Sequence, residues 1–197
     1  MIERGPATED EMISAFLQAE IDSPRWGPCV KAKLTHLGSG RLLIDSPNLK
    51  DAAENLRRKQ VLDCYRCYQP RKDIFTGFPL DVTWYRAELQ AQDFQTMQYM
   101  AHRYWSELSN GTRLVSVGAR NFPGYACDRR FLHIGAIIHD IRDGKRFAPL
   151  IAAQHHGGHL VLIEGHCRAT AYTVEGYAGL VEAFVSSSPS MNEWEFY

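Results

Sequence analysis

An apolar run that ends in Glu-Gly and continues directly into helix-forming residues constrains the fold of this chain more than any other feature. Residues 160–172 read LVLIEGHCRATAY. The run up to Glu164 has the length and composition of a buried strand, and ATAY favours a helix. Gly165 allows a turn between them and a close approach of another group to the backbone. The stretch predicts a strand that ends at Glu164 and a helix that begins near His166.

A second apolar run precedes this unit and is expected to pair with it. APLIAA at 148–153 and HLVLIE at 159–164 are separated by QHHGG, which suits the turn of a hairpin. Before them, DRRFLHIGAIIHDIRDG predicts a helix that stops at Gly144. The apolar face of that helix consists of Phe131, Ile134, Ile138 and Ile141.

The rest of the chain alternates helical and extended patterns irregularly, which favours an α+β fold over a doubly wound sheet. Thr8 and Glu11 form a capping-box signal at the start of the first helix. Ser46 or Asn48 is expected to cap the start of the second helix, and Pro47 is expected in its first turn. The further elements that we expect are helices over 8–21, 48–62 and 93–108 and strands over 80–89, 112–117 and 179–185.

The Pro- and Gly-containing stretch QPRKDIFTGFP at 69–79 predicts a loop. We place a boundary there, between a helical N-terminal portion over 1–72 and a main domain over 73–197. The main domain is expected to be a small mixed sheet with flanking helices. The aromatic tail MNEWEFY is expected to dock on its own core, with docking on a second subunit as the less favoured alternative.

Composition narrows the classes of function. The 197 residues carry a net charge of −1, which gives no electrostatic reason for tight, non-specific binding to nucleic acid or to an anionic membrane. No apolar run approaches the roughly 20 residues that span a bilayer. Five cysteines are an odd number, and we interpret them as reduced thiols in a cytoplasmic protein.

The start of the helix after Gly165 is the strongest candidate for chemistry. Its first backbone N–H groups lack partners inside the helix, and the helix dipole makes this end electropositive. An anion shared between these groups and Arg168 explains a cation in the first turn. Cys167 stands where a helix N-terminus lowers a thiol pKa, and Glu164 can act as a base or hold a metal. The alternative is structural: Arg168 pairs with Glu164, and Cys167 is buried.

The stretch HDIRDGKRFAPLIAAQHHGGHLVLIEGHCRATAY resembles the ParB/sulfiredoxin superfamily, in which a helix, a Gly, a Pro and an apolar strand precede a strand–Gly–x–x–Arg–helix motif. ParB proteins read G–E–R–R at the turn. Sulfiredoxins read G–C–H–R, so Cys167 stands one position away from their reactive cysteine. Free serine kinases read D–G–H–T–R, and this chain matches them at His166 and Arg168, with Glu164 in place of their acid and Cys167 in place of their threonine.

The resemblance implies nucleotide binding. In such a site the candidate nucleotide-binding residues are Gly165, His166, Cys167, Arg168 and Thr170. The candidate catalytic residues are Glu164 as a base and His166 as a group that stabilises transferring charge, with Mg²⁺ on the phosphates. Cys167 is not expected to be an obligatory nucleophile, because it occupies the place of a threonine in the best-matching sub-pattern.

Three other groups of side chains could have a functional role, and each also has a simpler structural explanation. His155, His156 and His159, with Cys167, can bind zinc, or they are solvated turn residues; we assign no metal site. The pair of cysteines in DCYRC at 63–67 lacks the context of a redox or zinc motif and is interpreted as chance. Arg129 or Arg130 can reach a phosphate, or both lie on a solvated helix face.

We therefore expect a nucleotide-binding protein that transfers or hydrolyses a phosphoryl group of ATP, ADP or CTP, a nucleotide di- or triphosphate, with Mg²⁺. The phosphate acceptor, a small molecule or a protein, is not identified by the sequence. The alternatives are a DNA-associated ParB-like nuclease or partition-type module and a catalytically inactive interaction domain. DNA is the less favoured partner because of the near-neutral charge, and no membrane partner is expected.

Overall fold

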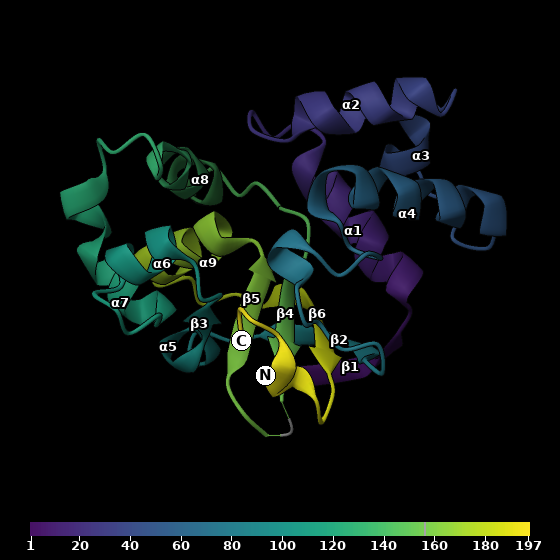
Figure 1. Cartoon of the computed structure of the whole chain (residues 1–197). Coiled ribbons are helices and arrows are strands. Elements are labelled where there is room, and N and C mark those ends of the chain that lie inside the picture. Colours follow the sequence, from purple (N-terminus) through teal and green to yellow (C-terminus); the bar gives the residue numbers. More distant parts are fainter. Residues whose placement is uncertain (156) are drawn as a thin grey trace.

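The computed structural model of the chain describes residues 1–155 and 157–197 and forms one mixed sheet with helices on both faces (Figure 1). The strand order is β1-β2-β6-β4-β5-β3. The strands are β1 (Ile2–Ala7), β2 (Thr83–Leu89), β3 (Gln98–Tyr99), β4 (Leu150–Gln154), β5 (Leu160–Glu164) and β6 (Val181–Ser187). The β4–β6 and β3–β5 pairs are parallel and the others antiparallel, so the expected α+β class is confirmed.

Two groups of helices cover the sheet (Figure 1). The first group consists of α1 (Glu9–Glu20), α2 (Gly27–His36), α3 (Leu42–Asp45) and α4 (Ala52–Arg66). The second consists of α5 (Asp93–Thr96), α6 (Arg103–Leu108), α7 (Val115–Asn121), α8 (Leu132–Arg142) and α9 (His166–Val174). Short 3₁₀ segments lie at Asp73–Phe75, Phe122–Tyr125 and Met191–Glu193.

The strand pattern explains why both faces of the sheet are covered. Along β4, Ile151 and Ala153 join the core under α1 and α4, while Leu150 and Ala152 join the core under α7, α8 and α9. Side chains alternate between the two faces of a strand, and here both faces are apolar. β4 and β5 therefore read as continuous apolar runs, as strands do in sheets that are buried on both sides.

Several local predictions are confirmed. Thr8 and Glu11 form the expected capping box at the start of α1. The runs at β4 and β5 form an antiparallel hairpin, and α8 ends just before Gly144, with Phe131, Ile134 and Ile138 buried. The 1–72 portion also contains β1, which the sequence pattern did not indicate and which pairs with β2 at one side of the sheet.

Other boundaries differ from the expectation. The second long helix begins at Ala52, because Asp51, rather than Ser46 or Asn48, caps it by accepting hydrogen bonds from Ala53 N and Glu54 N. The sequence pattern also missed α2 and α3. α3 has only four residues, and the Pro and Gly residues of SPRWGPC at 23–29 favoured a break in the chain where α2 begins.

The single helix expected over 93–108 is wrong, because it is interrupted by β3. Asp93 accepts hydrogen bonds from Gln90 N and the Met1 amino group, both at 2.7 Å. A second helix then starts after His102, whose ring caps α6. The strand expected over 112–117 is also wrong, because Val115 begins α7.

The aromatic tail docks on the chain's own core, as expected. Trp194 is buried, and its indole Nε1 donates to Ile74 O at 2.7 Å. The Tyr197 hydroxyl accepts from His155 N and donates to His159 O, both at 2.9 Å. The tail therefore closes over the β4–β5 turn, in which His156 lies outside the described residues.

Candidate functional site

The junction between β5 and α9 has the predicted strand–turn–helix geometry. β5 ends at Glu164, α9 begins at His166, and Gly165 between them has φ +97°. A Cβ at this position would lie 2.3 Å from Leu150 Cδ2 and 3.1 Å from Arg168 Nη2. A glycine is thus required at position 165 for two reasons. The backbone there is left-handed, and β4 and Arg168 pack closely against the turn.

Arg168 is buried and fully engaged with neighbouring protein atoms. Its Nη1 donates to Ala148 O and, at 3.3 Å, to Pro149 O. Its Nη2 donates to Glu164 Oε1 at 3.2 Å. The guanidinium therefore links the segment before β4 to the end of β5. The structural alternative from the sequence analysis, an ion pair between Glu164 and Arg168, is present.

A second ion pair, from the N-terminal helices, lies close to the first. Glu20 at the end of α1 is buried and accepts a hydrogen bond from Arg66 Nη2 at the end of α4. Burial raises the pKa of Glu20 to about 7, the charge of Glu164 adds to the increase, and Arg66 opposes it. Burial thus favours the protonated form of the Glu20 carboxyl, against the pull of Arg66.

His166 is held as a neutral imidazole. It stacks on Trp105, with ring centroids 4.9 Å apart and planes 10° apart, and lies 6.1 Å from the Tyr99 ring. Burial lowers its pKa to about 3, and the charges of Arg66, His102 and Arg168 contribute to the decrease. Its Nε2 is buried without a hydrogen-bond partner among the described residues, which is uncommon for a buried polar atom.

Thr170 is buried, and Cys167 is partly buried. Burial and then Glu164 raise the pKa of the Cys167 thiol to about 12, so the helix N-terminus does not activate it as the sequence argument suggested. Thr170 is fully buried, and its hydroxyl donates to His166 O at 2.8 Å and lies 2.7 Å from the Tyr99 hydroxyl.

Positive charge gathers around the start of α9 from several elements. Arg66 and Arg168 are buried there, and His102 begins α6. The pKa of His102 is lowered by burial and then by Arg25 and Arg103, which places those two guanidinium groups within electrostatic range. Arg130 is engaged elsewhere, with Glu107 and Asp128.

The sequence analysis identified the half of this cluster that is local in the chain and missed Glu20, Arg66 and the aromatic partners of His166. One signal for Glu20 was present: it follows Ile13 and Phe16 at helical spacing, so an acid lies on the apolar face of α1. No sequence signal related Arg66 to it.

Within residues 1–155 and 157–197, no three His, Cys, Asp or Glu side chains gather as ligands of one metal ion. In the same part of the chain, no helix combines the length and apolar character needed to cross a membrane.

Comparison of the chain with protein-family models, with curated proteins and with solved structures finds no match.

Proposed function

We propose that the start of α9 and the charged cluster that faces it bind a nucleotide and transfer or hydrolyse a phosphoryl group of ATP, ADP or CTP. The proposal rests on the position of two carboxyl groups, Glu20 and Glu164, that interact electrostatically with each other. They lie near the N-terminus of α9, where Arg66 and Arg168 supply positive charge. Such a helix end favours phosphate, and a carboxyl with a pKa near 7 suits a general base.

The roles of the residues follow from their surroundings. Backbone N–H groups in the first turn of α9 contact phosphate oxygens, and Arg66 adds positive potential. Arg168 acts through Glu164, because it already bonds to that carboxylate and to two carbonyl groups. Neutral His166 offers one hydrogen bond through Nε2 rather than a positive charge.

Mg²⁺ is compatible with this donor set. The ion commonly takes one or two protein carboxylates and completes its coordination with phosphate oxygens and water. Glu164 and ionised Glu20 are the carboxylates that would hold it, and the ion would neutralise charge on the phosphates. The step that the protein's own side chains would perform is proton transfer: the Glu20–Glu164 pair would accept a proton from an acceptor hydroxyl or from water.

One specific observation favours a second candidate, an interaction domain without turnover. Arg168 and Thr170 use their hydrogen bonds inside the protein, as residues that only support the fold would. Nucleotide binding without hydrolysis or transfer favours this candidate over the first.

The experiment is a thermal-shift screen of ATP, ADP and CTP, each with Mg²⁺, followed by calorimetry and turnover assays. A ligand at 100 times its Kd is expected to stabilise the fold by about 2.7 kcal/mol. In Glu20→Gln and Glu164→Gln, nucleotide affinity should persist while turnover falls roughly 10²-fold or more. Glu182→Gln, at an exposed position of β6, is the control.

The possible results separate the roles. If no nucleotide raises the melting temperature, the proposal is wrong as a whole. If nucleotide binds but neither Gln variant changes turnover, the site binds phosphate without using these carboxyl groups. Arg168→Ala is a poor test of binding alone, because loss of its buried bonds is expected to destabilise the fold as well.

A further inference from the structure

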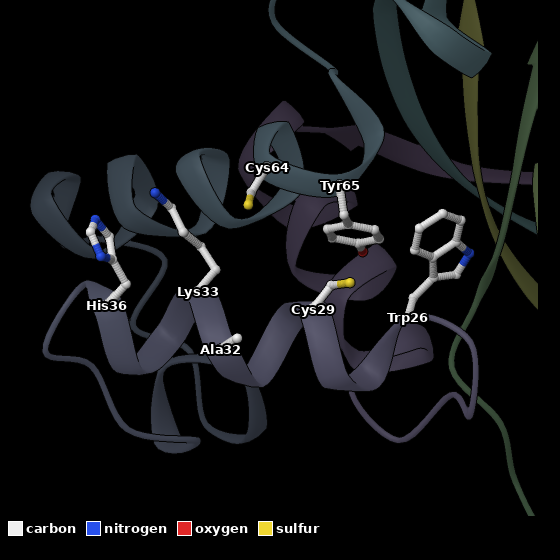
Figure 2. A pocket seen from close by; sticks show the side chains of 7 residues that line it. All are labelled: Trp26, Cys29, Ala32, Lys33, His36, Cys64 and Tyr65. Atoms are coloured by element: carbon white, nitrogen blue, oxygen red, sulfur yellow. The ribbon is translucent and has the colours of Figure 1, made fainter.

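A groove with a volume of about 660 Å³ lies between α2 and α4, outside the charged cluster at α9. Figure 2 shows its lining side chains, with Trp26 at one end and His36 at the other. The lining residues are Trp26, Cys29, Ala32, Lys33, His36, Cys64 and Tyr65. A volume between about 300 and 1,000 Å³ is typical of small-molecule sites.

The two ends of the groove differ in chemistry. At one end the rings of Trp26 and Tyr65 lie 5.5 Å apart. At the other end Lys33 and His36 project from the last turns of α2 (Figure 2). The middle is formed by small or weakly polar side chains, Cys29, Ala32 and Cys64. The groove is thus apolar along most of its length and basic at one end.

None of the seven side chains that line the groove is acidic, and Lys33 among them is basic. Beside the aromatic end, the guanidinium carbons of Arg25 and Arg66 lie 4.7 and 4.4 Å from the centroid of the Trp26 ring. Arg66 is paired there with the buried Glu20 carboxyl, so the positive charge open to an occupant lies mainly at the Lys33 end. An occupant with negative charge is therefore complementary to the groove, and a cationic one is disfavoured.

We propose that this groove binds a small aromatic carboxylate. Its ring system would pack near Trp26 and Tyr65, and its carboxylate would bind Lys33, with His36 beside it. Trp26 and Lys33 are seven residues apart, about 10 Å along α2, so a body of two fused rings and a carboxylate spans the distance. A single lysine at the charged end suits one negative charge better than the several charges of a nucleotide phosphate chain. Arg66 borders both this groove and the cluster at α9, but the proposal for the groove does not rest on the chemistry proposed at α9.

The cysteines supply a direct test. Cys29 and Cys64 are exposed and line the groove, whereas Cys127 is exposed and does not line it. The probe is 2-naphthoate, and the measurement is the rate of alkylation of each cysteine by neutral iodoacetamide, resolved by peptide mass spectrometry. At ten times its Kd, the probe should slow alkylation of Cys29 and Cys64 about tenfold, because protection follows the occupied fraction. Cys127 should react at an unchanged rate.

Two variants test the charged end. Lys33→Gln should weaken 2-naphthoate about tenfold, the scale of one charge-assisted hydrogen bond. Lys31→Gln is the matched control, since Lys31 lies on the same helix but does not line the groove, and it pairs with Asp22 at 3.2 Å. It should leave the affinity unchanged. The neutral amide of the probe should bind wild type and Lys33→Gln equally.

Three results would overturn the inference. The first is equal protection of Cys127, or no protection of Cys29 and Cys64 at millimolar probe. The second is protection by ATP or ADP but not by 2-naphthoate, which would make the groove a nucleotide site. The third is protection that rises with protein concentration in the absence of probe, which would mean that a second copy of the chain covers the groove.

Discussion

Glu20 is the residue whose surroundings most clearly depart from those of an ordinary surface carboxylate. Burial and the neighbouring Glu164 charge raise its pKa to about 7, whereas a glutamate in an unfolded chain has a pKa of about 4.3. The folded state therefore binds more protons than the unfolded state between these two pH values. The contribution of Glu20 to stability is complete below about pH 4.3 and is lost as pH rises through 7.

Glu20→Gln is expected to remove this pH dependence. The amide stays neutral at every pH, so the variant should resemble wild type near pH 4.5 and be more stable than wild type at pH 8, by up to about 4 kcal/mol. Urea denaturation at several pH values measures the difference. Glu193→Gln, at an exposed carboxylate outside the cluster, should leave the profile unchanged, and a constant gap between wild type and Glu20→Gln would contradict the argument.

His166 acts in the opposite direction, and the two effects overlap. Its pKa is lowered to about 3 in the folded chain, so the unfolded state binds the extra proton and stability falls as pH decreases from about 6.5 toward 3. Between roughly pH 4.5 and 6.5 the two slopes partly cancel in wild type. The Glu20→Gln variant should therefore show the acid sensitivity of His166 more clearly than wild type does.

Among the elements, the β5–α9 junction depends most strictly on one backbone conformation. Gly165→Ala places a Cβ where φ is +97° and where Leu150 Cδ2 lies 2.3 Å away. The left-handed backbone alone costs an alanine about 1 kcal/mol, and the clash adds to it. We expect a loss of about 2 kcal/mol or more in the free energy of unfolding.

A glycine inside α8 provides the matched control. A Cβ on Gly135 meets no atom within 4 Å, and alanine is the better helix former by up to about 1 kcal/mol. Gly135→Ala is therefore expected to stabilise the protein slightly, as measured by thermal or urea denaturation. Equal effects of the two substitutions would show that the turn is not a constraint.

The same elements show what a single sequence can predict. The capping box of α1 and the Glu164–Arg168 pair were predictable because each arises from residues three or four positions apart. α7 was mistaken for a strand because Leu114, Val115 and Val117 have high β-propensity. The fold overrides that propensity: Val115 is buried, and an added Cβ on Gly118 would lie 2.4 Å from the Tyr99 hydroxyl, so the helix packs closely on β3. The Glu20–Arg66 pair joins two helices whose meeting no local pattern encodes.

At the scale of the whole molecule, the tail joins the C-terminal segment to the middle of the chain. Trp194 packs 5.4 Å from the Phe78 ring and donates to Ile74 O, so it links the C-terminal segment to the loop that follows α4. Trp194→Ala should cost about 3–5 kcal/mol, the usual range for a buried Trp. Trp194→Phe keeps most of the packing and should cost less. Urea denaturation distinguishes them, and a loss below 1 kcal/mol for the alanine variant would contradict a structural role of the tail.

The position of β6 in the sheet has a consequence for the order in which the chain can assemble during translation. β6 pairs with both β2 and β4 although it is formed by residues 181–187. At about 5–20 residues per second, synthesis from the end of β2 to the end of β6 takes on the order of 5–20 s. During that interval the antiparallel β1–β2 pair has an edge without its partner strand, and open edges recruit other chains. This strand pair is thus the segment of the nascent chain that a chaperone would need to shield.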